Sequence, residues 1–234
     1  MDLIGVYLKE SFKRPGCPVC TLIEQCEKKT IEEILYEHVN DPVVRERFAE
    51  SLGLCSYHAW KIKEIAYSNP LYGGLGVAVI YRHMLSLYIK NLEKGEQIRE
   101  KECYLCKSVK EKERYTVGGL ADRMKELFEE YKTSEAILCK KHYDMLYLAL
   151  KKKNVELAEH FKEVQIQKLK EIENCMKRFI SKFDYRSKEA PTQKESLAGL
   201  LAIESLKGLP LGINFVKQKK KRSILGGILS ADGD

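Results

Sequence analysis

Residues 17–20 read CPVC and are followed by CSYH at residues 55–58, while residues 103–106 read CYLC and are followed by CKKH at residues 139–142. Each half of the chain thus carries a CxxC motif, an intervening stretch and a CxxH motif. Cys103 follows Cys17 by 86 residues, and Cys139 follows Cys55 by 84 residues. Because both motifs recur at nearly the same offset, the sequence indicates an internal duplication.

The residue types in these motifs are those of a metal site. Three cysteine thiolates and one histidine imidazole form a recognised ligand set for structural zinc. Residues three apart at the start of a helix present their side chains together, so a CxxC and a CxxH on two helices can each supply half of a tetrahedron. The sequence predicts two Cys₃His metal sites, with zinc as the expected ion and with these ligands: Cys17, Cys20, Cys55, His58, Cys103, Cys106, Cys139 and His142.

Two questions about these sites stay open. Proximity along the chain favours a first site built from the first CxxC and the first CxxH, but the first CxxC could instead join the second CxxH if the two halves interlock. Cys26 and Cys175 fall outside the motifs. Cys26 lies two turns after Cys20, and a buried small side chain is the favoured interpretation over a substitute ligand.

The same residues could also carry redox chemistry. Three cysteines and a histidine can hold an iron-sulfur cluster, which is the alternative cofactor. A third possibility leaves the CxxC pairs as dithiols, since Cys17 and Cys20 at a helix start resemble a thioredoxin-type redox site. No βαβ pattern surrounds that motif, however, and a dithiol does not explain why a CxxH follows each time.

The chain is patterned as helix almost throughout, and no segment of useful length alternates as a strand does. The predicted helices cover residues 3–12, 19–38, 42–51 and 56–67, residues 77–92, a short stretch after Cys106, residues 120–131, a stretch through His142 capped by Thr133 or Ser134, and a long stretch from Asn154 to Phe183. Asp41 is the expected N-cap of the 42–51 helix, and Gly118-Gly119 is expected to break the helix after Cys106. The 77–92 helix has a wide apolar face, which predicts the central buried helix of the first half.

These features predict an all-α, internally duplicated helical bundle. Residues 1–95 and 96–186 are the expected repeats, and residues 187–234 are the expected tail, with a brief helix at 197–206 followed by a flexible basic segment. The basic run Lys217–Arg222 could contact nucleic acid or an anionic membrane surface. A solvated tail is the favoured interpretation of that run.

Composition narrows the class of protein further. The 234 residues are 44% hydrophobic and 32% charged, with a net charge of +7 of which +3 lies beyond residue 186. Positive and negative charges are close to balanced in the residues before 187, which argues against a nucleic-acid-binding groove in that part of the chain. The amino terminus does not read as a secretory signal, and residues 75–92 are too interrupted by charge to span a bilayer. We therefore expect a cytoplasmic protein, whose eight cysteines are metal ligands or redox groups in preference to a disulfide framework.

The arrangement of motifs resembles a family of bacterial and archaeal proteins catalogued as a domain of unknown function. The resemblance covers residues 16–183 and includes CPVC, the Asn40-Asp41-Pro42 step, GLCSYH at 53–58, GLGVA at 74–78 and the second CxxC and LCxxH. Members of that family usually have an aromatic residue where this chain has Leu54, and a second proline where it has Tyr104. Neither difference removes a ligand. The resemblance implies the paired-site architecture and carries no activity with it.

The sequence thus favours a non-enzymatic, metal-binding scaffold or interaction module with a protein partner that it does not name. The alternatives are a redox protein that uses the same eight residues and a nucleic-acid binder that uses the basic tail.

Overall fold

The computed structural model describes residues 3–96 and 101–209, so the basic run Lys217–Arg222 lies outside the described residues. Within them the chain is helical, and their one β-type contact is an isolated bridge between Gly16 and Ala136. The all-α prediction is confirmed. The elements in chain order are α1 (Leu3–Phe12), α2 (Pro18–Glu33), the π-helical η1 (Ile34–His38), α3 (Pro42–Ala49), α4 (Ser56–Ser68), α5 (Leu75–Lys94), α6 (Tyr104–Thr133), α7 (Lys140–Lys153), α8 (Val155–Ser181) and α9 (Gln193–Lys207).

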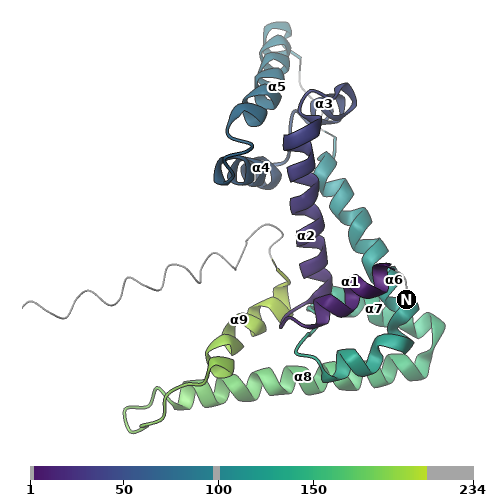
Figure 1. The fold of residues 1–234 in the computed structure, drawn as a ribbon, viewed down its shortest axis with the longest axis vertical. Coiled ribbons are helices and arrows are strands. Elements are labelled where there is room, and N and C mark those ends of the chain that lie inside the picture. Colours follow the sequence, from purple (N-terminus) through teal and green to yellow (C-terminus); the bar gives the residue numbers. More distant parts are fainter. Residues whose placement is uncertain (1–2, 97–100, 210–234) are drawn as a thin grey trace, which may run out of the picture.

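Two long helices form the axis of the molecule. α2 continues into η1 without a break, which gives a helix of roughly 30 Å at 1.5 Å per residue. α6 packs along α2 in the opposite direction, as Figure 1 shows. In that view α3, α4 and α5 surround the upper end of the pair, and α1, α7, α8 and α9 surround the lower end. The motifs at the beginnings of α2 and α6 therefore lie at opposite ends of the axis.

Each end of the axis has its own hydrophobic core. The core at the α8 end contains buried side chains from α1, α2, α6, α7 and α8, among them Leu8, Ile23 and Phe161. The core at the α5 end contains buried side chains from α2, η1, α3, α4, α5 and α6, among them Phe48 and Leu105. Because both cores use helices from both halves of the chain, neither half encloses a core by itself.

Local signals set several helix boundaries as expected. The Asp41 carboxylate accepts hydrogen bonds from the backbone amides of Val43 at 2.8 Å and Val44 at 3.3 Å, so the predicted N-cap of α3 is confirmed. Gly95 adopts a left-handed conformation with φ of 69° and ends α5. The Asn154 side chain caps α8 by accepting from the amide of Leu157. These caps satisfy backbone groups that a helix end otherwise leaves unpaired.

The prediction of a break at Gly118-Gly119 is wrong, because α6 runs through both glycines for 30 residues. Two interior glycines cost about 1 kcal/mol each relative to alanine. Burial of Leu120, Met124 and Leu127 on the same helix outweighs that cost, since each buried side chain of this size stabilises by roughly 1.5–3 kcal/mol. Tertiary packing thus overrides the local glycine signal.

The segment between α6 and α7 also differs from the prediction. Neither Thr133 nor Ser134 caps α7, which begins at Lys140 with Cys139 as its N-cap residue. The intervening residues lie outside any helix, and the amide of Ile137 donates to the carbonyl of Gly16 at 2.9 Å. This contact places the residues just before Cys139 beside the residue just before the first CxxC motif.

α5 is not the central buried helix that its apolar face predicts. It packs against α3, α4 and η1 through one face that buries Ile80 and Met84. Apolar side chains on the rest of the helix are largely exposed: Leu75, Leu85, Tyr88, Ile89 and Leu92. Its counterpart α8 packs against α6, α7 and α9 and buries Phe161 and Val164, although Leu169 and Ile180 of that helix are exposed.

The first part of the predicted tail is an ordered helix packed on the body. α9 begins at a capping box, in which Thr192 and Glu195 bond each other's backbone amides, and it packs along α8. Glu195 also accepts from Arg178 and Lys182 of α8 and its C-cap, at 3.2 Å and 2.9 Å. Among the described helices, α9 included, none combines the length and apolar character needed to cross a membrane.

Candidate metal centres

The eight predicted ligands gather into two groups of four. Centre I contains Cys17, Cys20, Cys139 and His142, and centre II contains Cys55, His58, Cys103 and Cys106. Within each group the candidate ligand atoms all lie within 4.8 Å of one another. The favoured pairing within each half is therefore wrong, and the interlocked alternative is the one that the fold adopts.

The length of α2 explains the interlocked arrangement. The helix carries the chain away from Cys20, and when the chain returns at α4 it lies beside Glu27, whose carboxylate is 2.7 Å from the imidazole of His58. Seven residues of helix separate Cys20 from Glu27, roughly 10 Å along the axis. The first CxxH therefore cannot reach the first CxxC, and meets the start of the antiparallel α6 instead.

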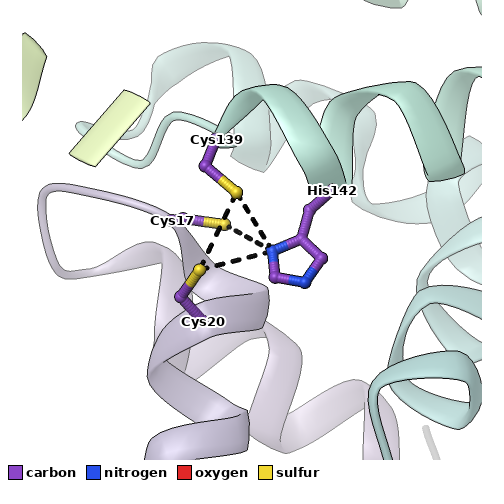
Figure 2. A group of neighbouring side chains, drawn as sticks. All are labelled: Cys17, Cys20, Cys139 and His142. Carbon is purple, nitrogen blue, oxygen red and sulfur yellow. Dashed lines mark hydrogen bonds between the residues drawn. The ribbon is translucent and has the colours of Figure 1, made fainter. Parts of the chain in front are cut away.

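In centre I three sulfur atoms surround one ring nitrogen. Figure 2 shows Cys17 and Cys20 of the α2 start facing Cys139 and His142 of the α7 start. The Nδ1 atom of His142 lies 3.3 Å from the sulfur of Cys17, 3.3 Å from that of Cys20 and 3.2 Å from that of Cys139. The sulfurs of Cys20 and Cys139 are 3.8 Å apart.

Centre II repeats this geometry at the other end of the axis. The Nδ1 atom of His58 lies 3.2 Å from the sulfur of Cys55, 3.7 Å from that of Cys103 and 3.4 Å from that of Cys106. The sulfurs of Cys55 and Cys106 are 3.5 Å apart. A tetrahedral ion with bonds of about 2.3 Å to sulfur and 2.0 Å to nitrogen has edges of roughly 3.5–3.8 Å between its ligands. Both groups therefore have the size of a single four-coordinate metal ion.

The first cysteine of every motif occupies the same position on its helix. Cys17, Cys55, Cys103 and Cys139 are the N-cap residues of α2, α4, α6 and α7, and none of these side chains caps its helix with a hydrogen bond. A helix amino terminus carries a partial positive charge and stabilises an anionic thiolate. Two helix dipoles thus converge on each centre and offset part of its negative charge.

Two glutamates that the sequence analysis missed complete the centres. The Nε2 atom of His58 lies 2.7 Å from a carboxylate oxygen of Glu27, and the Nε2 atom of His142 lies 2.8 Å from one of Glu113. Such a carboxylate holds a ligating imidazole in one tautomer and orientation, with Nδ1 free to bind a metal. A signal was present, because Glu27 and Glu113 both stand ten residues after the first cysteine of their CxxC motif.

These glutamates make each long helix part of both centres. α2 contributes cysteines to centre I and Glu27 to centre II, while α6 contributes cysteines to centre II and Glu113 to centre I. A lysine accompanies each carboxylate, Lys61 on Glu27 and Lys141 on Glu113, both at 2.5 Å. The Lys61 side chain is 8% exposed and the Lys141 side chain is 64% exposed, so the two ion pairs lie in very different surroundings.

The electrostatics of each cluster favour an ionised pair. Burial lowers the pKa of His58 and of His142, but hydrogen bonds with cysteine sulfurs raise both to about 10, and at His58 the hydrogen bond with Glu27 contributes to the rise. Burial raises the pKa of Cys103, and its hydrogen bond with His58 brings it down to about 6. The pKa of Cys139 is also well below its ordinary value, because Cys17, Cys20 and His142 hydrogen-bond to its sulfur. Each centre thus already stabilises one thiolate, the form of cysteine that binds metal, while burial raises the pKa of Cys17 in centre I and of Cys106 in centre II.

The remaining cysteines lie outside both centres, as predicted. Cys26 is half-buried on α2, and Cys175 is buried on α8, where Arg178 donates to its sulfur at 3.1 Å. All eight cysteines of the chain are free thiols. Neither Cys26 nor Cys175 belongs to a group of candidate ligands among the described residues.

Comparisons with known proteins agree with the duplicated architecture. The chain is 27% identical over 216 residues to the "Uncharacterized 23.9 kDa protein in xynA 3'region" of Caldicellulosiruptor sp. (strain Rt8B.4), an alignment that covers 85% of this chain and 98% of that protein. No solved structure matches the chain. The model of one family, described as a family of unknown function, matches twice, over residues 2–99 and 88–208. The two overlapping matches together span nearly all of the described residues, and the chain belongs to this family of unknown function, DUF6062.

Proposed function

We propose that the protein binds one zinc ion in each centre and uses the two ions to join the halves of a helical scaffold. The observation that carries this proposal is that each centre takes two ligands from each half of the chain. A metal ion in such a site binds the folded arrangement and not the separated helices, so its binding free energy stabilises the fold. All eight ligands then serve the same structural role.

The geometry supports a single ion over the alternatives. An iron-sulfur cluster places several irons and sulfides between its ligands, which must stand further apart than the 4.8 Å limit within each centre. A dithiol needs two sulfurs and gives no reason for the imidazole and the carboxylate beside it. Thiolate and imidazole in a tetrahedral arrangement suit zinc better than magnesium, calcium or manganese, which prefer oxygen ligands.

We also propose a role in protein interaction and not in catalysis. Four protein ligands leave no open position on the ion for a substrate or an activated water. The helices around centre II carry exposed apolar side chains, including Trp60 and Tyr67 of α4 and Leu85 and Leu92 of α5. Exposed apolar surface of this kind is common at protein interfaces. Eight reduced cysteines suit the cytoplasm, where thiols are kept reduced.

Elemental analysis and a visible spectrum test the metal proposal directly. Protein purified without oxygen or chelator is expected to contain two zinc ions per chain, one for each centre, and to show no visible absorbance. Iron with acid-labile sulfide would support the redox alternative. A protein that contains neither zinc nor iron would overturn the proposal.

Matched cysteine variants assign the ions to the centres. Cys20→Ser is expected to remove the zinc of centre I and Cys106→Ser that of centre II, because each loses a ligand. Cys26→Ser changes a cysteine of the same helix as Cys20 outside both centres, and it should retain both ions. Loss of zinc from Cys26→Ser would contradict the assignment.

Binding through Lys217–Arg222 remains a separate prediction, tested by the salt dependence of nucleic-acid binding with and without residues after Val216.

A further inference from the structure

The two centres differ in their access to solvent. In centre I all four ligands are buried, with Cys17, Cys20 and Cys139 exposed by 3% or less. In centre II Cys103 and His58 are buried, but Cys55 and Cys106 are half-buried. Two cysteines of centre II are therefore partly exposed to solvent, whereas every ligand of centre I is buried.

The last described helix, α9, contacts centre I. A carboxylate oxygen of Glu204 on α9 accepts from the backbone amide of Cys17 at 2.5 Å. Gly208 follows α9 with φ of 76°, and a Cβ placed on it would lie 3.4 Å from the sulfur of Cys20 and 3.5 Å from that of Cys139. The chain thus passes directly over centre I.

We propose that centre II is a thiol-oxidation site, in which peroxide converts Cys55 and Cys106 into a disulfide and releases the metal ion. This inference rests on the proposed zinc binding and adds a chemical difference between the two centres. Centre I keeps its ion under the same conditions and holds the rest of the fold together.

The geometry selects this pair of cysteines. Their sulfurs are 3.5 Å apart, and closing to a disulfide bond requires an approach of about 1.5 Å. Both are half-buried, whereas Cys103 is 6% exposed. Oxidation of cysteine follows thiolate character and exposure, and metal-bound cysteines are thiolates. The disulfide joins the N-cap of α4 to the first turn of α6, so it preserves a link that the ion provided.

The reaction balances with hydrogen peroxide as the oxidant. One thiolate attacks a peroxide oxygen and becomes a sulfenic acid as hydroxide leaves. The other thiolate attacks the sulfenic sulfur, which forms the disulfide and releases a second hydroxide. Two protons from solvent convert both hydroxides to water. The zinc ion keeps its charge and dissociates because two of its four ligands are lost.

The test uses the full-length, zinc-loaded protein without substitutions. Peroxide is titrated in the presence of the chromogenic chelator 4-(2-pyridylazo)resorcinol, free thiols are then blocked with N-ethylmaleimide, and the protein is digested for mass spectrometry without reduction. We expect loss of one of the two zinc ions, a crosslinked peptide pair containing Cys55 and Cys106, and blocked, unoxidised Cys17, Cys20 and Cys139. Reduction with dithiothreitol and added zinc should restore the second ion.

Several outcomes would overturn the inference. Release of both ions at the same peroxide concentration, earlier oxidation of centre I, or no oxidation of Cys55 and Cys106 would each do so while leaving the zinc proposal intact. A protein that contains no zinc at the start refutes the proposed function itself, so the two failures are distinguishable. As a matched control, Cys26→Ser changes another half-buried cysteine outside the centres and should release one ion as the unmodified protein does.

Discussion

Replacing Glu27 by glutamine is expected to destabilise the protein far more than replacing Glu113 by glutamine. Both changes remove the ionised carboxylate beside a ligating imidazole, which typically weakens metal binding by about 10–100-fold, or roughly 1.4–2.7 kcal/mol. The accompanying lysines decide the difference. The Glu27 side chain is fully buried and its partner Lys61 is 8% exposed, whereas Lys141 beside Glu113 is 64% exposed.

The magnitude follows from this difference in burial. Removing one partner of a buried ion pair costs about 3–5 kcal/mol, because the other charge is left buried and unpaired. An exposed pair contributes about 0–1 kcal/mol, since its lysine can turn to water. We therefore expect Glu27→Gln to lower the free energy of unfolding by about 2–5 kcal/mol more than Glu113→Gln. The assay is urea denaturation of both variants at one buffered concentration of free zinc.

A second substitution tests the physical reason. In the Glu27→Gln background, Lys61→Met removes the unpaired charge and keeps most of the side-chain volume, so it should recover about 1–3 kcal/mol. Equal destabilisation by the two glutamine variants, or a further loss of stability on adding Lys61→Met, would refute the reasoning.

Three further changes probe the helices and one half-buried lysine. Gly118→Ala should stabilise by about 0.5–1 kcal/mol in urea denaturation, because α6 is helical there and an added Cβ meets nothing within 4 Å; a loss of stability would show that α6 needs the glycine. Asp41→Ala should lower the free energy of unfolding by about 1 kcal/mol because the α3 cap is lost, whereas Asp41→Asn should retain most of the stability because asparagine also caps helices. Equal losses of stability in the two variants would contradict the capping role. Burial lowers the pKa of Lys168 to about 8 from 10.5, despite nearby glutamates that raise it. Because its charged form is disfavoured in the folded state, stability should rise between pH 8 and 10.5 relative to Lys168→Met, and a difference in urea midpoints that stays constant with pH would contradict this.

The sequence determined the candidate ligands and their positions on helices. Thiol and imidazole chemistry singles out the eight residues, and CxxC and CxxH at helix starts place each pair on one side of a helix regardless of the partner. Local chemistry likewise placed the Asp41 cap, because a cap depends on residues within a few positions. The repeated offset indicated duplication, in agreement with the double match to the family model.

The tertiary structure decided how the motifs combine. Nearly equal sequence gaps leave either pairing possible, and the rigid length of α2 with the antiparallel packing of α6 places each CxxC beside the CxxH of the other half. Packing also kept α6 continuous through Gly118 and left the apolar face of α5 open, although periodicity treats α5 and α8 alike. The cover that α9 provides over centre I depends on contacts between residues nearly 190 positions apart, from Cys17 to Glu204. Such contacts arise from the whole fold, so no local pattern in the sequence encodes them.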